Sequence, residues 1–128
     1  MSYAQKLQER MDEKIEEKIT QRNLRQDMLK KAHEKIKEFV GDVFVKNKLP
    51  KRYVSLDGIS VRIRKSFLVF FKKTELTVFT LHGTFFLSTH HNSIGSPCGG
   101  IQGLMDGIVD YYANNEDVII QYIRATKK

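Results

Sequence analysis

The N-terminal part of the chain carries an apolar residue at every fourth position from Leu7 to Ile19. On an α-helix, residues four apart stack on one face with an offset of about 40°, so this spacing predicts a helix with a narrow apolar seam. The seam consists of Leu7, Met11, Ile15 and Ile19. Two charged rows keep the same spacing: a basic row of Lys6, Arg10, Lys14, Lys18 and Arg22, and an acidic row of Glu9, Glu13 and Glu17. The pattern therefore predicts a helix striped by charge.

The seam stops where Asn23 replaces the next apolar residue. A second apolar set begins at Leu24, five residues after Ile19, and so lies about 140° round the helix from the seam. One straight helix would not bury both sets, and Asn23 with Gln26 three residues on resembles an N-cap with its capping-box partner. We therefore expect a break or kink within residues 20–23 and a second helix after it.

The seam is too short to hold an isolated helix together, so it predicts a contact with another apolar surface. Its constant spacing of four, rather than alternating three and four, argues against a long left-handed coiled coil. The contact is either the core of the same chain or a second copy. Because the seam points away from the apolar face of the next predicted helix, we expect a second copy and at least a homodimer.

The middle of the chain alternates apolar and polar residues, which is typical of β-strands. Residues 53–56 and the alternating run 59–71 flank the dipeptide Asp57-Gly58, which suits a two-residue hairpin turn. The run 59–71 forms either one bent strand with Lys65 at a bulge or two strands with a turn at residues 64–66. We prefer the two-strand interpretation.

Two further turns are predicted, one over Lys72–Glu75 and one at His82-Gly83, leading into strands at residues 76–81 and 84–88. These strands complete an antiparallel meander. A polar, glycine-rich loop over residues 89–100 follows.

The C-terminal part returns to helical spacing from Ile101 to Ala113, with Gly103 and Gly107 on the side away from the apolar residues. Two glycines weaken a short helix, so we expect a close backbone approach there. The last segment, residues 117–124, is rich in β-branched residues but follows an Asn cap and two acids; we interpret it as a helix.

These elements predict one α+β domain over residues 1–128, with two N-terminal helices, an antiparallel meander of four or five strands, and one or two C-terminal helices. The helical segment 1–48 packs on, or extends from, a meander-plus-helix core at 52–125. No apolar run reaches about 18 residues and no signal-peptide pattern is present, so we expect no membrane contact. A single cysteine excludes an internal disulfide and favours the cytoplasm.

The charge is uneven along the chain. The net charge is +7, and residues 49–75 carry seven basic and two acidic side chains. Such a local excess favours nucleic acid or another polyanion as a partner. If Val61 and Ile63 pack on the helices, Arg62 and Arg64 face the other way, onto an open sheet surface. The candidate nucleic-acid-binding residues are Arg62, Arg64, Lys65, Lys72 and Lys73, with Phe70 as a stacking aromatic.

A second function is open at this point. The charged N-terminal helix could make the chain a protein-interaction module, either an oligomeric adaptor or an inhibitor of an acidic partner, with the seam as its interface. Phenylalanine-rich strands are equally typical of a buried core or a dimer contact, which fits this alternative.

A remote third function is a cysteine-dependent enzyme. Cys98 precedes a predicted helix, whose dipole would favour the thiolate, and His90 or His91 could serve as its base. No family signature surrounds Cys98 and no third orienting residue is identifiable, so we expect a non-enzymatic protein. A zinc site would need a fourth ligand beyond these three residues, so we expect neither metal nor cofactor.

Overall fold

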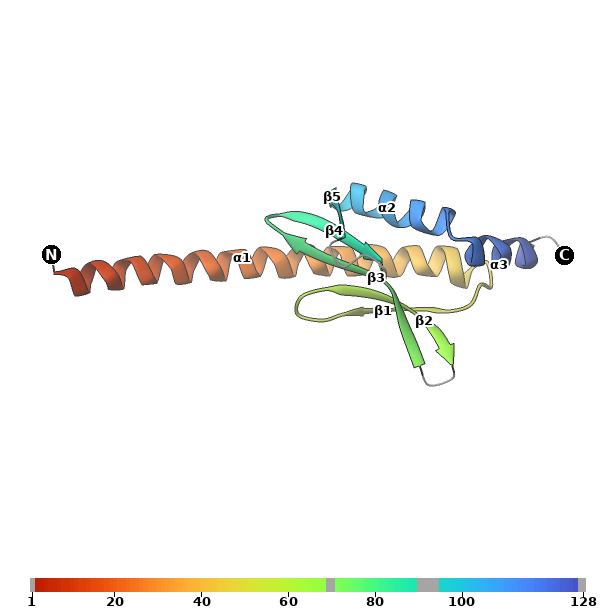
Figure 1. The fold of residues 1–128 in the computed structure, drawn as a ribbon, viewed down its shortest axis with the longest axis horizontal. Helices are drawn as coiled ribbons and strands as arrows, with labels where there is room; N and C mark the ends of the chain where they lie inside the picture. Colours follow the sequence, from red (N-terminus) through yellow and green to blue (C-terminus); the bar gives the residue numbers. More distant parts are fainter. Residues whose placement is uncertain (1, 69–70, 90–94, 127–128) are drawn as a thin grey trace.

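The computed structural model describes residues 2–68, 71–89 and 95–126 and has an α+β layout (Figure 1). A long helix is followed by a five-stranded sheet and two short helices. The helices are α1 (Tyr3–Val40), extended by a π-helical turn η1 (Gly41–Val45), α2 (Ile101–Ala113) and α3 (Glu116–Thr126). The strands are β1 (Arg52–Leu56), β2 (Val61–Leu68), β3 (Phe71–Leu81), β4 (Thr84–Thr89) and β5 (Ser96–Gly99). The predicted α+β class and antiparallel meander are confirmed.

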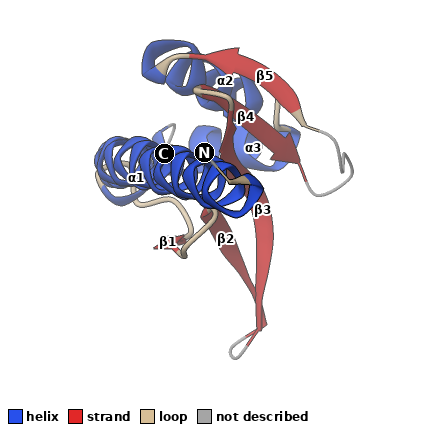
Figure 2. Ribbon diagram, turned by 90° about the vertical axis from the view of Figure 1, so that its left-hand side faces the viewer, coloured by secondary structure: helices blue, strands red, loops and turns tan. Residues whose placement is uncertain are grey.

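The sheet follows the chain, with strand order β1-β2-β3-β4-β5 and every neighbouring pair antiparallel. Helix α1 packs on β1, β2 and β3, while α2 packs on β4 and β5, on the same side of the curved sheet (Figure 2). The core therefore lies between the helices and one face of the sheet. Its fully buried side chains are led by Phe44, Leu29, Ile36, Ile63, Leu76, Leu104, Ile108, Val61 and Val78.

The prediction of two N-terminal helices is wrong, because α1 is continuous through residues 20–23. The break was inferred from Leu24, but this side chain is 53% exposed and is not part of the core. The residues that α1 does bury start at Leu29, and at 100° per residue their mean direction lies about 35° from that of the seam. One straight helix can therefore carry both the seam and these buried residues on nearly the same side. The capping box lies at the true N-terminus, where Ser2 and Gln5 exchange hydrogen bonds of 3.2 Å.

The strand boundaries in the middle of the chain also differ from the prediction. Strand β2 runs through residues 64–66 and β3 runs through residues 72–75, so the turns expected at these two places are wrong. The alternation changes because the register shifts: Ile63 pairs with Leu76, but Arg64 pairs with Thr74, which leaves Glu75 as an extra residue on β3. The bulge bends the hairpin without ending a strand.

The turns on either side of this hairpin can be compared with the predicted ones. His82 and Gly83 both have positive φ angles, 50° and 74°, as the predicted two-residue turn between β3 and β4 requires. The β1–β2 connection is longer than expected, because Leu56 pairs with Val61 across a four-residue loop. In this loop Asp57 Oδ1 accepts backbone N–H bonds from residues 59 and 60, at 2.9 Å and 2.8 Å.

The C-terminal helices agree with the prediction, and residues 117–124 are helical. Asn115 caps α3 by accepting the Val118 N–H at 3.2 Å. Gly103 makes the expected close approach, since a Cβ there would overlap the carbonyl oxygen of Cys98. That carbonyl belongs to β5, a strand that lies within the segment expected to be a loop. No helix in the described part of the chain is both long and apolar enough to cross a membrane.

Candidate nucleic-acid interface

The pairing register places three of the predicted basic residues on one face of the sheet. Directly paired residues share a face, and successive residues alternate between faces. Arg62 and Arg64 alternate with the buried Val61 and Ile63, so they lie on the face away from the helices. Lys72 pairs with Ser66, two residues beyond Arg64, and lies on the same face. We call this side of the sheet the outer face.

The other two predicted lysines lie on the opposite face. Lys65 pairs with Lys73 on one side and with the buried Arg52 on the other. Lys65 and Arg52 line a cleft whose far wall is formed by α3, including Gln121 and Arg124. The five predicted basic residues are therefore divided between two faces, and Phe70 lies outside the described residues.

Aromatic side chains accompany the basic residues of the outer face. Tyr53 pairs with Arg64 across β1 and β2, and its ring is contacted by the Nζ atoms of Lys72 at 4.1 Å and Lys51 at 5.0 Å from its centroid. Sequence reasoning missed Tyr53, although the adjacent Lys51 and Arg52 are a visible signal of a basic and aromatic cluster. Tyr53, Arg64 and Lys72 thus bring charge and aromatic surface together on this face.

A second aromatic group extends the outer face towards β4. Phe79 and Phe86 pair directly, and their half-buried rings stack with centroids 5.4 Å apart and planes 8° apart. Phe79 follows Thr77 by two residues, and Thr77 pairs with Arg62, so the stacked rings share the face of the arginines. The outer face therefore carries charge at one end and apolar rings at the other.

The two arginines of the outer face differ in their partners. Arg62 Nε lies 3.7 Å from Asp57 Oδ2, and both side chains are more than a third exposed. The hydrogen bond from the Ile59 backbone N–H lowers the pKa of Asp57, with smaller contributions from the Ser60 donors and from the positive charge of Arg62, so this carboxylate is a stable counter-charge. Arg64 has no such partner among the described residues, and its buried Nε atom has no hydrogen-bond acceptor. Arg64 is therefore the less neutralised of the two cations.

Cys98 lies in β5, and its side chain is half-buried. Its Sγ atom lies 3.5 Å from the Ser96 carbonyl oxygen, and burial raises the pKa of the thiol, whereas the helix dipole was expected to favour the thiolate. His90 and His91 lie outside the described residues. Within residues 2–68, 71–89 and 95–126, no three His, Cys, Asp or Glu side chains are grouped closely enough to hold a metal ion.

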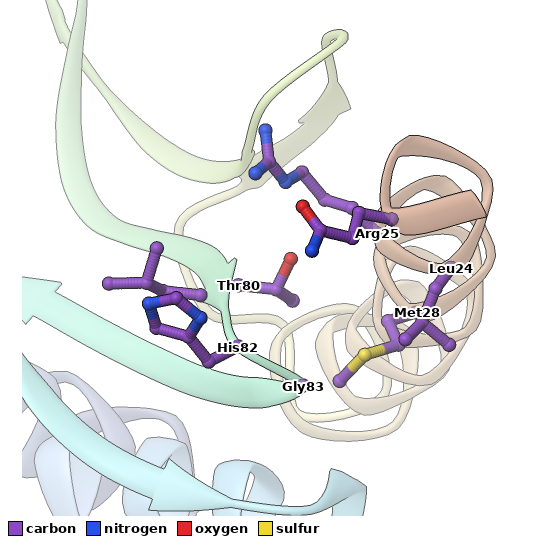
Figure 3. A pocket seen from close by; sticks show the side chains of 8 residues that line it. Leu24, Arg25, Met28, Thr80, His82 and Gly83 are labelled. Atoms are coloured by element: carbon purple, nitrogen blue, oxygen red, sulfur yellow. The ribbon is translucent and has the colours of Figure 1, made fainter. Parts of the chain in front are cut away.

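A second cleft lies between α1 and the β3–β4 hairpin. It has a volume of about 400 Å³, and Arg25 and Met28 of α1 face Thr80 and His82 across it (Figure 3). Among the residues that the structure describes, no carboxylate and no thiol lines the cleft.

Comparisons of the chain with protein-family models, curated proteins and solved structures found no match. The candidate function therefore depends on the geometry of the outer face.

Proposed function

We propose that this protein binds single-stranded nucleic acid through the outer face of its sheet. The observation that carries the proposal is the grouping of Arg62, Arg64 and Lys72 with Tyr53 on a face that no described helix covers. A sheet face that combines cations with aromatic rings can pair with phosphates and stack on bases at the same time.

The two kinds of side chain have separate roles in this proposal. The guanidinium of Arg64 and the ammonium of Lys72 attract the phosphate backbone, because neither forms an ion pair with a described carboxylate. The Tyr53 ring offers a stacking surface for a base. A duplex keeps its bases stacked on one another, so the aromatic contribution favours a single strand.

The excess charge of the surrounding segment supports the same proposal. Residues 49–75 carry five more basic than acidic side chains, and the buried pair of Arg52 and Glu75 cancels within the core. The excess therefore lies on the surface of the β1–β3 region, where it raises the local concentration of a polyanion.

The test compares two double charge reversals on opposite faces. Arg62→Glu with Arg64→Glu changes the outer face, and Lys65→Glu with Lys73→Glu changes the other face by the same four charges. Fluorescence anisotropy at low salt, with single strands of about 20 nucleotides, measures the affinity of each variant. Because both variants change the net charge equally, a difference in affinity between them reports the position of the changed charges. We expect the outer-face variant to bind at least about tenfold more weakly than the matched control.

A third variant separates loss of the site from loss of the fold. Lys72→Glu, at an exposed position, should weaken binding while leaving the circular dichroism spectrum and the thermal midpoint unchanged. Equal losses for both double reversals would contradict the proposed face. No association with any DNA or RNA would contradict the function, and the predicted protein-interaction module would then be the function to test.

A further inference from the structure

The N-terminal half of α1 projects beyond the globular part of the molecule (Figure 1). Every residue from Ser2 to Asp27 is exposed, whereas the buried positions of α1 begin at Leu29. The four seam residues are each between 52% and 61% exposed. The chain's own core therefore does not cover the seam, which was one of the two contacts expected for it.

The seam lies on nearly the same side of α1 as the residues that this helix buries in the core. Because the mean direction of the buried residues of α1 lies about 35° from that of the seam, the globular part sits on the seam's side of the helix. A partner on the seam must therefore lie on the same side as the sheet, just beyond its edge.

The two flanks of the seam have opposite charge. At 100° per residue the basic row lies about 100° to one side of the seam, and the row that contains Asp12 and Glu16 lies about 100° to the other side. The acidic row of Glu9, Glu13 and Glu17 is on the back of the helix. The seam is thus an apolar strip between a positive and a negative border.

We propose that the seam binds the seam of a second copy, with the two helices parallel. A twofold axis along the helices places the basic row of each copy against Asp12 and Glu16 of the other. A twofold axis perpendicular to the helices would instead place basic row against basic row. The charge pattern therefore selects the parallel arrangement.

The spacing of the seam also determines how the helices cross. Residues four apart form a ridge inclined to the helix axis, and two such ridges interdigitate when the axes cross at about 50°. The contact then centres on Met11 and Ile15, and the helices diverge towards their C-terminal ends. This divergence leaves room for two globular parts that both lie on the seam's side of their helices. A long parallel coiled coil would keep the helices together and leave no such room.

The first experiment tests the contact itself. Sedimentation velocity on the full chain should show a dimer for the parent and a monomer for Ile15→Glu. Gln21→Glu is the matched control, because it adds the same charge at an exposed position that extends the acidic row on the back of the helix, and it should remain a dimer. A monomeric parent, or a parent and an Ile15→Glu variant of equal size, would overturn the proposal.

The second experiment tests the parallel order. One variant carries Arg10→Glu and Lys14→Glu, and the other carries Asp12→Lys and Glu16→Lys. In a parallel dimer each variant alone pairs like charges, so each should dimerise at least about tenfold more weakly, and an equimolar mixture should recover parental affinity as a heterodimer. In an antiparallel dimer each variant alone would still pair like charges, as the parent does, so its affinity would match that of the parent, and the mixture would bind more tightly than the parent. Either result would overturn the parallel order.

Neither experiment involves nucleic acid. A failure of the dimer therefore leaves the proposed binding face untouched, and a failure of nucleic-acid binding leaves the dimer untouched.

Discussion

Arg52 and Glu75 form a bidentate ion pair inside the protein. Arg52 Nε lies 2.9 Å from Glu75 Oε1 and Nη2 lies 3.3 Å from Oε2, and both side chains are at most 4% exposed. The Tyr112 hydroxyl donates to Glu75 Oε1 at 2.6 Å, and the Arg52 guanidinium lies 4.7 Å from the centroid of the Phe44 ring. The pair thus joins β1, β3 and α2 around the bulge at Glu75.

Removing the carboxylate should destabilise the fold strongly. Glu75→Gln leaves the Arg52 guanidinium buried without a counter-charge, so we expect the free energy of unfolding to fall by about 3–5 kcal/mol. Equilibrium unfolding in urea, followed by circular dichroism, measures this change. Arg52→Lys keeps the charge but loses the second hydrogen bond, so it should lower the free energy of unfolding by less than Glu75→Gln does. A loss below about 1 kcal/mol for Glu75→Gln would contradict a buried pair.

The same network predicts a loss of stability in alkali. Burial, followed by the nearby charge of Glu75 and the hydrogen bond to it, raises the pKa of Tyr112 well above its usual value of 10.0. The folded state therefore keeps the proton after the unfolded chain has lost it, so the contribution of Tyr112 is complete below about pH 10 and declines above it. The decline approaches about 1.4 kcal/mol per pH unit.

The measurement compares urea unfolding of the parent and Tyr112→Phe from neutral pH to about pH 11. The variant lacks the titrating hydroxyl, so its free energy of unfolding should depend less steeply on pH, although it is lower at neutral pH by about 1 kcal/mol because a hydrogen bond is lost. Other alkaline groups titrate equally in both proteins. Parallel curves would contradict the raised pKa.

Two glycines predict opposite effects of the same substitution. A Cβ at Gly103 would overlap the backbone oxygen of Cys98, so Gly103→Ala should push α2 away from β5 and destabilise the fold by at least about 2 kcal/mol. Gly41 has helical backbone angles and open space around it, so Gly41→Ala should stabilise by about 0.5–1 kcal/mol. Thermal midpoints measured side by side should move in opposite directions.

Local signals in the sequence were sufficient for several elements. The amphipathic spacing of α2, the Asn115 cap of α3 and the two-residue turn at His82-Gly83 each depend on residues close in the chain, and all three are confirmed. The continuity of α1 could not be obtained in this way. Periodicity cannot tell a core leucine from an exposed one, and Leu24 is exposed because it lies about 140° round the helix from Leu29, where the buried residues of α1 begin.

The candidate site was also predictable only in part, because local alternation fixes the face of some of its residues and not of others. Alternation from Ile63 places Arg62 and Arg64 on one face and Lys65 on the other, so these three residues of the predicted site do not share a face. The face of Lys72 depends on the bulge at Glu75, which is held by Arg52 from a distant part of the chain. A non-local buried pair therefore decides a register that no local pattern shows.

The last prediction separates the charged and stacking parts of the proposed interface. Binding a single strand with Z phosphate contacts releases counterions, so the logarithm of the affinity should fall with the logarithm of salt concentration at a slope of about 0.7Z. Arg64→Ala should reduce this slope by about 0.7, because its guanidinium has no carboxylate partner among the described residues and is free to contact a phosphate. Tyr53→Ala should instead weaken binding by about 1–3 kcal/mol at every salt concentration and leave the slope unchanged, because stacking releases no ions. Arg62→Ala should change the slope less than Arg64→Ala does, since Asp57 already neutralises part of its charge. Anisotropy titrations at four or more salt concentrations measure all three slopes, and a Tyr53→Ala slope that falls as far as that of Arg64→Ala would contradict the separate role of the ring.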